Sequence, residues 1–496
     1  MLRRKLDLRI CRQLALTVGV VSTGAVLAGP KLPLAYPPAH KCDQVDEYHG
    51  VKVNDPYRWL EDVDSQETHA WIAAQNEVTF AYLEQIPARD KINERLTELW
   101  DYEKYGVPVK HGGRYFYTKN DGLQNQSVLY WTPALEAEPR VLFDPNLLAE
   151  DGTIAASGYA ISEDGKRLAY GLSASGSDWQ EWKVRNVDTG EDLDDHLKWV
   201  KFSSASWTKD GAGFYYGRYD EPDQSELMQK TNYFQKLYYH RVGTPQSDDK
   251  LVYHRPDQKD WMFSGSVTDD GRYLIISIDR GSDNKYLIFY KDLQADDAPV
   301  VELISKFEAE YAFIDNDGPV FWFRTDLDAP RGRVVAIDTR KPQRENWNEL
   351  IPESGDALRH VTAVGGSFVA SYLSDARSRV KVFGTEGKII REAELPGIGT
   401  ASGFSGKRDD PETFYFYTSF PVIRWDLMPP ERFASLLTKL NASRRPFYAV
   451  LFQFEHEDVR WERLPAAWEK IAMVDGVGIW RLDPDASLDA VSPPRP

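Results

Sequence analysis

The chain has 496 residues, of which 42% are hydrophobic and 13% aromatic, so it is neither a small disulfide scaffold nor a fully disordered protein. At roughly 150 residues per domain, this length predicts about three domains or one large repeat domain with appendages. A formal net charge of −17 repels phosphate backbones and anionic lipid, which argues against nucleic acid as a partner. The only cysteines, Cys11 and Cys42, exclude a disulfide framework and a cysteine-rich zinc site.

Residues 1–28 have the pattern of a secretory signal. Met1–Arg12 are rich in arginine, Leu14–Ala28 carry no charge, and Val26-Leu27-Ala28 offers a cleavage site. The apolar run is shorter than the ~20 residues that a spanning helix needs. We expect a periplasmic or secreted protein if the signal is cleaved, and a cytoplasmic one otherwise. The alternatives are an uncleaved anchor and a misassigned start codon, and no other membrane contact is expected.

Two helices are predicted next. Asp64 can cap the first, with Glu67 three residues on, and Pro87 closes it. Its apolar stripe is formed by Trp71, Ala74, Val78 and Tyr82. The stripe of the second helix is formed by Ile92, Leu96, Leu99 and Trp100. Both stripes are large and need something to cover them.

A repeated design then organises the middle of the chain: a turn rich in Gly or Asp, followed by a strand-like aromatic run. The seven turns are Gly112-Gly113, Asp164-Gly165, Asp210-Gly211, Asp270-Gly271, Asp317-Gly318, Gly365-Gly366 and Asp409-Asp410-Pro411. Successive copies lie 45 to 60 residues apart. Asp-Gly is typical of tight hairpins, and this period is typical of propeller blades. We therefore predict a mainly β fold with a seven-bladed β-propeller, the alternative being a β-sandwich with frequent hairpins.

The chain changes character after Leu427, where Pro429-Pro430 breaks it. The remaining residues predict a short α/β tail over 428–496. Its expected elements are a helix around Phe433–Leu440, a strand at Tyr448–Phe454, a helix at Pro465–Met473 and a strand at Ile479–Leu482.

Several stretches carry a resemblance to a known family. They are YHGV at 48–51, DPYRWLED at 55–62, NDGLQNQ at 120–126, YGLSASGSDW at 170–179, QKLYYH at 235–240 and FYTSF at 416–420. From about Tyr36 to Leu427 the chain resembles the N-terminal part of prolyl oligopeptidase, in the serine peptidase family that includes oligopeptidase B. The resemblance implies hydrolase-side helices over 36–100 and a seven-bladed propeller over 101–427. In that family the propeller caps an α/β-hydrolase domain and admits only short peptides, which are cleaved after proline.

No catalytic residue is predicted in this chain. An α/β-hydrolase needs a Ser on a Gly-x-Ser-x-Gly elbow, then Asp and His, and no Ser here has Gly both two before and two after it. Ser173 comes nearest, in Gly171–Gly176, but the spacing is one residue off. His456 is the only His after Leu427, and no family motif surrounds it.

No metal or cofactor site is predicted either. Glu455–Asp458 have ligand residue types but no second His at helical spacing, so a solvated strand end is the better interpretation. His111-Gly112-Gly113 is interpreted as a hairpin entry, and His240 and His254 as hydrogen-bonded blade residues. Trp179 and Arg218 lie in blade segments that can face a shared cavity, but the sequence does not place them.

Three functions follow from these observations. The first is a truncated, prolyl oligopeptidase-like protein that is inactive alone, because acyl transfer needs an activated Ser, a base and oxyanion donors together. The second is a serine-type prolyl endopeptidase whose hydrolase part is supplied by another chain or lost by frameshift. The third is a propeller module that binds peptides or proteins. The expected partners are short peptides, a hydrolase chain or a second copy of this chain.

Overall fold

The computed structural model describes residues 34–134, 137–222, 231–295, 297–393, 395, 399–401, 404, 406–408 and three strands between Tyr448 and Leu482. The predicted signal and the predicted helix at Phe433–Leu440 lie outside the described residues. The chain divides into two compact units. The first comprises Met1–Glu103 with Asp121–Leu123, and the second Lys104–Asn120 with Gln124–Pro496. Neither described helix is both long and apolar enough to cross a lipid bilayer.

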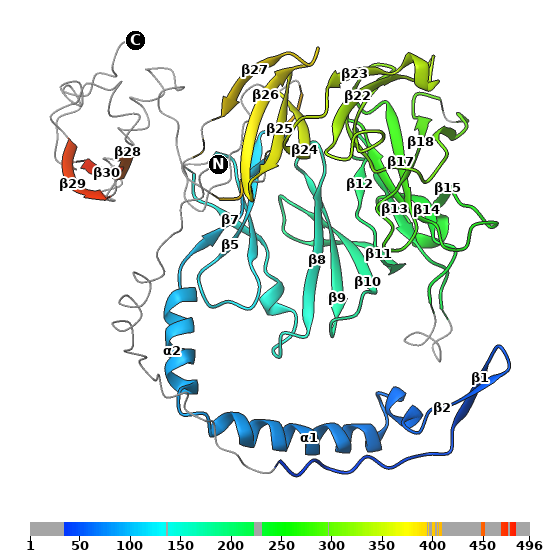
Figure 1. The fold of residues 1–496 in the computed structure, drawn as a ribbon, viewed down its shortest axis with the longest axis vertical. Coiled ribbons are helices and arrows are strands. Elements are labelled where there is room, and N and C mark those ends of the chain that lie inside the picture. Colours follow the sequence, from blue (N-terminus) through cyan, green and yellow to red (C-terminus); the bar gives the residue numbers. More distant parts are fainter. Residues whose placement is uncertain are drawn as a thin grey trace, which may run out of the picture. The chain divides into compact units, whose positions relative to one another are not determined.

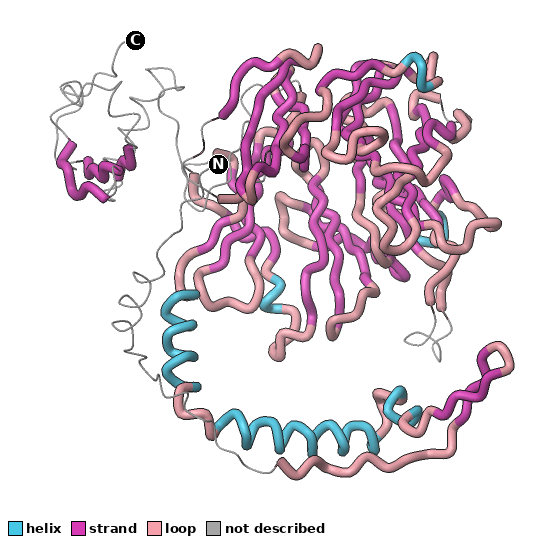
Figure 2. The backbone as a smooth tube through the Cα atoms, viewed as in Figure 1, coloured by secondary structure: helices cyan, strands magenta, loops and turns pink. Residues whose placement is uncertain are grey.

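The first unit contains a β-hairpin and two α-helices, drawn in cyan in Figure 2. Its elements are β1 (Val45–Tyr48), β2 (Val51–Asn54), the 3-10 helix η1 (Arg58–Glu61), α1 (Gln66–Glu84) and α2 (Arg89–Trp100). The predicted cap of α1 is wrong by one residue. The cap is Ser65, whose hydroxyl accepts a hydrogen bond of 3.1 Å from the Thr68 amide, whereas Asp64 lies one position too early.

Aromatic stacking covers part of the α1 stripe from within the same unit. The His40 and Trp59 rings stack at 4.5 Å, and Trp59 meets Trp71 edge-on at 6.4 Å. The Trp59 indole also donates to the His40 carbonyl at 3.1 Å. The extended segment before β1 therefore supplies some of the cover that the stripe requires, while Ile92 and Leu96 of α2 stay exposed.

The second unit is built of antiparallel sheets that follow one another from cyan to yellow in Figure 1. Their strands form six four-stranded groups among the described residues, here called blades 1 to 6. Blade 1 is β4 (Val109–His111), β5 (Arg114–Asn120), β6 (Val128–Thr132) and β7 (Arg140–Phe143), with β3 (Lys104–Tyr105) added on β5. Blade 2 is β8 (Ile154–Ile161), β9 (Arg167–Ala174), β10 (Gln180–Asn186) and β11 (Asp192–Val200). Blade 3 is β12 (Ser206–Trp207), β13 (Gly213–Arg218), β14 (Lys236–Arg241) and β15 (Lys250–Tyr253).

The next three blades each form a separate sheet with its strands in sequence order. Blade 4 is β16 (Met262–Val267), β17 (Tyr273–Asp279), β18 (Leu287–Asp292) and β19 (Val301–Ile304). Blade 5 is β20 (Tyr311–Asp317), β21 (Val320–Thr325), β22 (Arg333–Asp338) and β23 (Asn348–Ile351). Blade 6 is β24 (Ala357–Val364), β25 (Ser367–Ser374), β26 (Arg377–Gly384) and β27 (Ile389–Ala393). The seventh turn, at 409–411, lies outside the described residues, so a count of seven blades stays a prediction.

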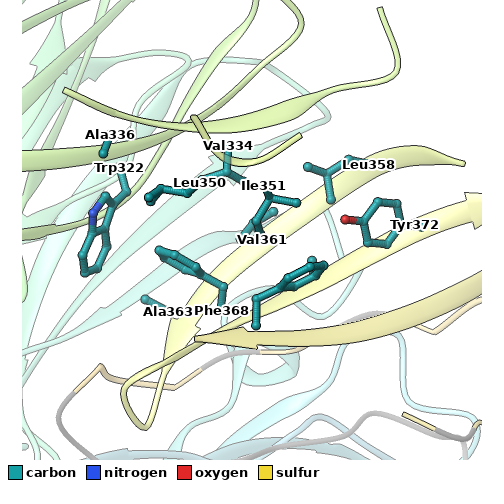
Figure 3. Packing of buried hydrophobic residues seen from close by; sticks show 12 residues of the cluster. Trp322, Val334, Ala336, Leu350, Ile351, Leu358, Val361, Ala363, Phe368 and Tyr372 are labelled. Carbon is teal, nitrogen blue, oxygen red and sulfur yellow. The ribbon is translucent and has the colours of Figure 1, made fainter. Parts of the chain in front are cut away.

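The apolar core lies between consecutive blades. Figure 3 shows the cluster that joins blade 5 to blade 6, in which the Trp322 and Phe368 rings meet edge-on at 5.0 Å. Equivalent clusters join the other consecutive pairs among blades 1 to 6. Each of blades 2 to 5 buries both faces against its neighbours, which is how a propeller covers short aromatic strands.

The predicted turns of the blades meet one another, and we call this set of contacts the turn ring. Its hydrogen bonds join Arg167 to the Gly211 carbonyl, Lys209 to the Asp269 carbonyl, Asn316 to the Asp270 carboxylate, and the Gly366 amide to the Arg408 carbonyl. Between blades 1 and 2, a Cβ on Gly112 would lie 1.9 Å from the Asp164 carbonyl oxygen, so only glycine fits. Glycine at this turn therefore does more than allow a hairpin: it lets two blades approach.

The described part of the C-terminal tail is a three-stranded antiparallel sheet. Its strands are β28 (Tyr448–Leu451), β29 (Trp468–Val474) and β30 (Val477–Leu482), in the order β28-β30-β29. The predicted helix at Pro465–Met473 is wrong, because Trp468–Val474 pairs with β30 along its length. Asp475-Gly476 lies between the two strands, and this hairpin signal outweighs the helical spacing.

Candidate functional site

The described residues bring no serine, histidine and carboxylate together as a catalytic triad. Ser173 of β9 donates its hydroxyl to the carbonyl of Ser177, in the turn between β9 and β10 of blade 2. No described histidine ring nitrogen hydrogen-bonds a serine hydroxyl. Likewise, no three His, Cys, Asp or Glu side chains of the described part gather as a metal site. His456 and Glu455–Asp458 lie outside the described residues.

His240 is a structural residue of blade 3, as predicted. Its side chain is 0% exposed and lies between two carboxylates, with Nδ1 2.6 Å from Asp249 and Nε2 2.9 Å from Asp195. Burial disfavours the charged imidazole, but the two carboxylate hydrogen bonds outweigh it and raise the pKa of His240 to about 9. Asp195 belongs to β11 of blade 2, so this ion triad ties two blades together.

Two other histidines of the propeller, His111 and His254, differ from each other. His111 ends β4 directly before the Gly112-Gly113 turn, which confirms the hairpin entry. Its Nδ1 lies 4.0 Å from Glu163. His254 was expected to be a hydrogen-bonded blade residue, and that expectation is wrong. It lies exposed just after β15 and makes no side-chain hydrogen bond to any described residue.

A different group of side chains gathers where blade 2 meets blade 3. The two blades are joined by a single β-bridge, between Val200 of β11 and Arg218 of β13. Around this bridge lie Trp179, Trp199, Lys201, Phe202, Arg218 and Tyr219, here called the aromatic cluster. Trp179 is at its centre: its ring meets Trp199 and Tyr219 edge-on, each at 5.9 Å.

Cations already pack on the rings of the aromatic cluster. The Lys201 ammonium lies 5.2 Å from the Trp179 ring centroid and 5.3 Å from that of Phe202. The Arg218 guanidinium lies 4.0 Å from the ring centroid of Tyr238, a residue of β14 outside the cluster. Such rings attract cations through their negative faces. The ring faces are therefore shared with cations of the chain itself, and the aromatic cluster is suited to the apolar parts of a ligand.

Two buried N–H groups of the aromatic cluster have no hydrogen-bond acceptor among the described residues. They are Nε1 of Trp179 and Nε of Arg218. Buried donors are nearly always paired, so an unpaired donor requires an explanation. A carbonyl oxygen from a ligand would satisfy either group once the side chains that cover it move.

Backbone strain is concentrated in the same place. Trp199, Phe202 and Phe234 have φ angles of 63°, 54° and 61°, in the left-handed region that bulky side chains rarely adopt. Phe234 belongs to the segment held against Lys201, because Lys201 contacts Asn232 at 3.0 Å and accepts from Gln235 at 2.9 Å. Strain of this kind costs about 1–3 kcal/mol per residue and is typical of ligand-binding sites. Phe202 nevertheless leaves 54% of its surface exposed.

Comparison with known proteins identifies the scaffold. The family model described as "Prolyl oligopeptidase, N-terminal beta-propeller domain" matches residues 37–422. The chain belongs to the prolyl oligopeptidase family. Among its relatives, the prolyl endopeptidase of Elizabethkingia miricola is 36% identical over 409 residues, covering 82% of this chain and 57% of the relative. Prolyl oligopeptidase A of Galerina marginata is 37% identical, covering 86% and 64%.

Solved structures agree with this assignment. Prolyl oligopeptidase B from Galerina marginata, bound to a 35mer hydrolysis and macrocyclization substrate, is 29% identical with a TM-score of 0.68, covering 76% of this chain and 56% of that one. A structure from a study of two prolyl endopeptidases is 36% identical with a TM-score of 0.58, covering 76% and 54%. The chain thus spans about three fifths of the length of the relatives it matches.

Sequence reasoning found only part of the aromatic cluster. Trp179 and Arg218 were noted as residues that can face a cavity, and the structure brings Trp179 against Tyr219, the residue after Arg218. Trp199, Phe202 and Tyr219 were missed. A usable signal was present, because Trp199-Val200-Lys201-Phe202 places two large aromatic residues and a cation at the end of a strand.

Proposed function

We propose that the propeller of this prolyl oligopeptidase-family chain binds short, proline-containing peptides at the aromatic cluster. The observation that carries the proposal is a pair of buried donors beside packed aromatic rings, Nε1 of Trp179 and Nε of Arg218, for which the described part of the chain supplies no acceptor. Proline-rich segments dock on aromatic-lined surfaces because their extended conformation is already formed and costs little entropy. Their backbone carbonyls are the acceptors that both donors lack.

The relatives support a peptide as the ligand. Their names describe prolyl endopeptidases and prolyl oligopeptidases, and one solved relative holds a 35mer peptide substrate. For this chain, a peptide bound at the propeller would be selected by size before it reached a hydrolase domain. The propeller would then act as a gate for short peptides.

We further propose that these 496 residues do not cleave peptides by themselves. They contain no Gly-x-Ser-x-Gly elbow, and the described histidines are engaged by carboxylates or lack a serine partner. Acyl transfer requires a nucleophile, a base and oxyanion donors held in one site. Cleavage would need a nucleophile from a hydrolase segment outside this sequence.

Two measurements on the purified chain test these proposals. Titration with a proline-containing tetrapeptide should change the tryptophan fluorescence saturably, and a matched peptide with alanine for proline should bind more weakly. Trp179→Phe removes the indole N–H and Phe202→Ala removes an exposed ring, so both variants should weaken binding. Leu147→Ala is the matched control, because Leu147 is 83% exposed in the 3-10 helix η2 (Pro145–Leu147), which connects blade 1 to blade 2.

A fluorophosphonate label tests the absence of catalysis. We expect no labelled serine. Covalent labelling would disprove the inactivity, and an unchanged fluorescence at millimolar peptide would disprove the binding proposal.

A further inference from the structure

One carboxylate beside the aromatic cluster has no cation among the described residues. Asp279 is the last residue of β17 in blade 4 and lies opposite Met262 of β16 in the strand register. The next residue along β16 is Phe263, which lies directly against Gly217 of blade 3. A Cβ placed on Gly217 would be only 2.9 Å from the Phe263 carbonyl oxygen. Gly217 precedes Arg218 and Tyr219, so Asp279 lies at the blade 4 side of the aromatic cluster. Its charge acts on Tyr219, where it contributes, after burial, to raising the pKa to about 12.

Four other acidic residues in blades 2 to 5 and their loops have cationic partners. Asp178 lies 3.6 Å from Lys201, Asp220 lies 2.6 Å from Lys236, and Asp283 lies 3.1 Å from Arg280. Glu310 forms an ion pair with Arg324. By contrast, the Asp279 carboxylate makes no hydrogen bond or ion pair with any described residue, although it is partly buried.

A partly buried carboxylate without a partner is costly to the fold. Burial alone raises the pKa of Asp279 to about 6, because desolvation disfavours the charged form. Charged groups removed from water are normally paired, and the cost of leaving one unpaired is recovered only when a cation arrives. Carboxylate-to-ammonium hydrogen bonds are among the stronger ones in proteins.

We propose that Asp279 binds a positively charged group of the peptide, either its α-ammonium group or a lysine side chain near its N-terminus. The inference rests on the proposed peptide binding at the aromatic cluster and names the class of peptide that the site prefers. The peptide would lie with its apolar and proline residues on Trp179 and Phe202 and with its cation at Asp279.

The test compares three proline-containing tetrapeptides that differ only at the N-terminal end. One has a free N-terminus, the second is N-acetylated, and the third is N-acetylated with lysine as its first residue. Binding to the full chain is followed by tryptophan fluorescence and calorimetry at pH 7.5. We expect at least one cationic peptide to bind about tenfold more tightly than the neutral acetylated peptide.

The variant Asp279→Asn should remove this preference and leave the affinity for the neutral peptide unchanged. Asp220→Asn is the matched control, because it removes a carboxylate that is already paired at the same end of blade 3. A preference for the free N-terminus alone assigns the site to the α-ammonium group, and a preference for the lysine peptide alone assigns it to the side chain. If both cationic peptides bind more tightly than the neutral acetylated peptide, the site accepts either cation.

Two failures are distinguishable. If all three peptides bind equally to the unmodified chain, or if Asp279→Asn keeps the preference, the inference about Asp279 is overturned while peptide binding stands. If none of the three peptides binds, both the inference and the proposed function are overturned. Circular dichroism of Asp279→Asn, with a thermal midpoint at or above that of the unmodified chain, shows that the variant is folded.

Discussion

Nζ of Lys407 lies 2.6 Å from Oε2 of Glu163, although 244 residues separate the two in the sequence. Nζ of Lys209 lies 2.9 Å from the same oxygen, so one carboxylate holds two ammonium groups from distant parts of the chain. Lys407 follows blade 6 and Glu163 belongs to the blade 2 turn. The ion pair therefore joins the segment after blade 6 to the turn of blade 2, and the contact is made by side chains rather than by strand pairing.

Glu163→Gln should lower the stability of the propeller by about 1 kcal/mol, because all three side chains are partly exposed and solvent weakens the pairs. Burial alone would raise the pKa of Glu163, but the hydrogen bonds from Lys407 and Lys209 lower it below the ordinary value of 4.5. Its stabilising contribution is present above that value and lost as the pH falls through the lowered pKa.

Thermal melts at pH 7 and pH 3, in low and high salt, check this expectation. The difference between Glu163→Gln and the unmodified chain should shrink at pH 3 and in high salt. Glu181→Gln, which removes an exposed acid next to His196, should change the midpoint little at any pH. An unchanged midpoint for Glu163→Gln at pH 7 in low salt would show that the turn ring does not depend on this pair.

His240 predicts the opposite pH dependence. Its pKa is raised from 6.5 to about 9, so the folded state keeps a proton that the unfolded chain releases near pH 6.5. The stabilisation is fully present below about pH 6.5 and is lost as the pH rises to about 9, by an amount on the order of 3 kcal/mol. Melting midpoints should therefore fall between pH 7 and pH 9.5.

His240→Gln tests the assignment to this residue. It leaves Asp195 and Asp249 buried without a cation, so the variant should be less stable than the unmodified chain at pH 7. Its melting midpoint should also lack the steep fall between pH 7 and pH 9.5. A variant that keeps the same fall would assign the pH dependence to other groups. Should it fail to fold, the pKa of His240 in the unmodified chain, measured by NMR titration, decides between a value near 9 and one near 6.5.

Asp279→Asn should make the chain more stable at pH 7, by on the order of 1–3 kcal/mol. The folded-state pKa of about 6 exceeds the ordinary value of 3.8, so the folded state holds a proton that the unfolded state has released between these values. Stability therefore falls as the pH rises from about 4 to 6, and asparagine avoids this loss. Chemical denaturation should give Asp279→Asn a higher free energy of unfolding than the unmodified chain at pH 7, and an equal one at pH 3.5. Equal stability at both values would mean that Asp279 is well solvated.

Much of the fold could be predicted because its signals are local. Gly112, Gly165 and the other turn glycines show in the sequence as Gly-Gly or Asp-Gly pairs, and the aromatic runs after them have the composition of buried strands. The tail was harder, because Trp468–Val474 has apolar residues at helical spacing and only its pairing with β30 makes it a strand. The triad around His240 joins residues 9 and 45 positions away, so its partners could not be read from the sequence. The same holds for Asp279, whose defining property is that no described residue pairs with it in three dimensions.

Phe202 provides a test of whether the strained backbone belongs to the binding site. Its φ of 54° penalises any residue with a Cβ, whereas glycine adopts this angle freely. Phe202→Gly and Phe202→Ala both remove the exposed ring, so both should weaken peptide binding to the same extent. They should differ in stability, with the glycine variant about 1 kcal/mol more stable than the alanine variant.

Leu147 supplies the matched comparison, because it is also exposed but lies in a 3-10 helix (Pro145–Leu147) with an ordinary negative φ. There the order should reverse, and Leu147→Gly should be less stable than Leu147→Ala by about 1 kcal/mol. Thermal midpoints give the stabilities, and tryptophan fluorescence gives the peptide affinities. If the two Phe202 variants are equally stable, the left-handed backbone relaxes once the ring is gone. The strain would then be imposed by the phenyl group itself rather than by the segments that hold Lys201.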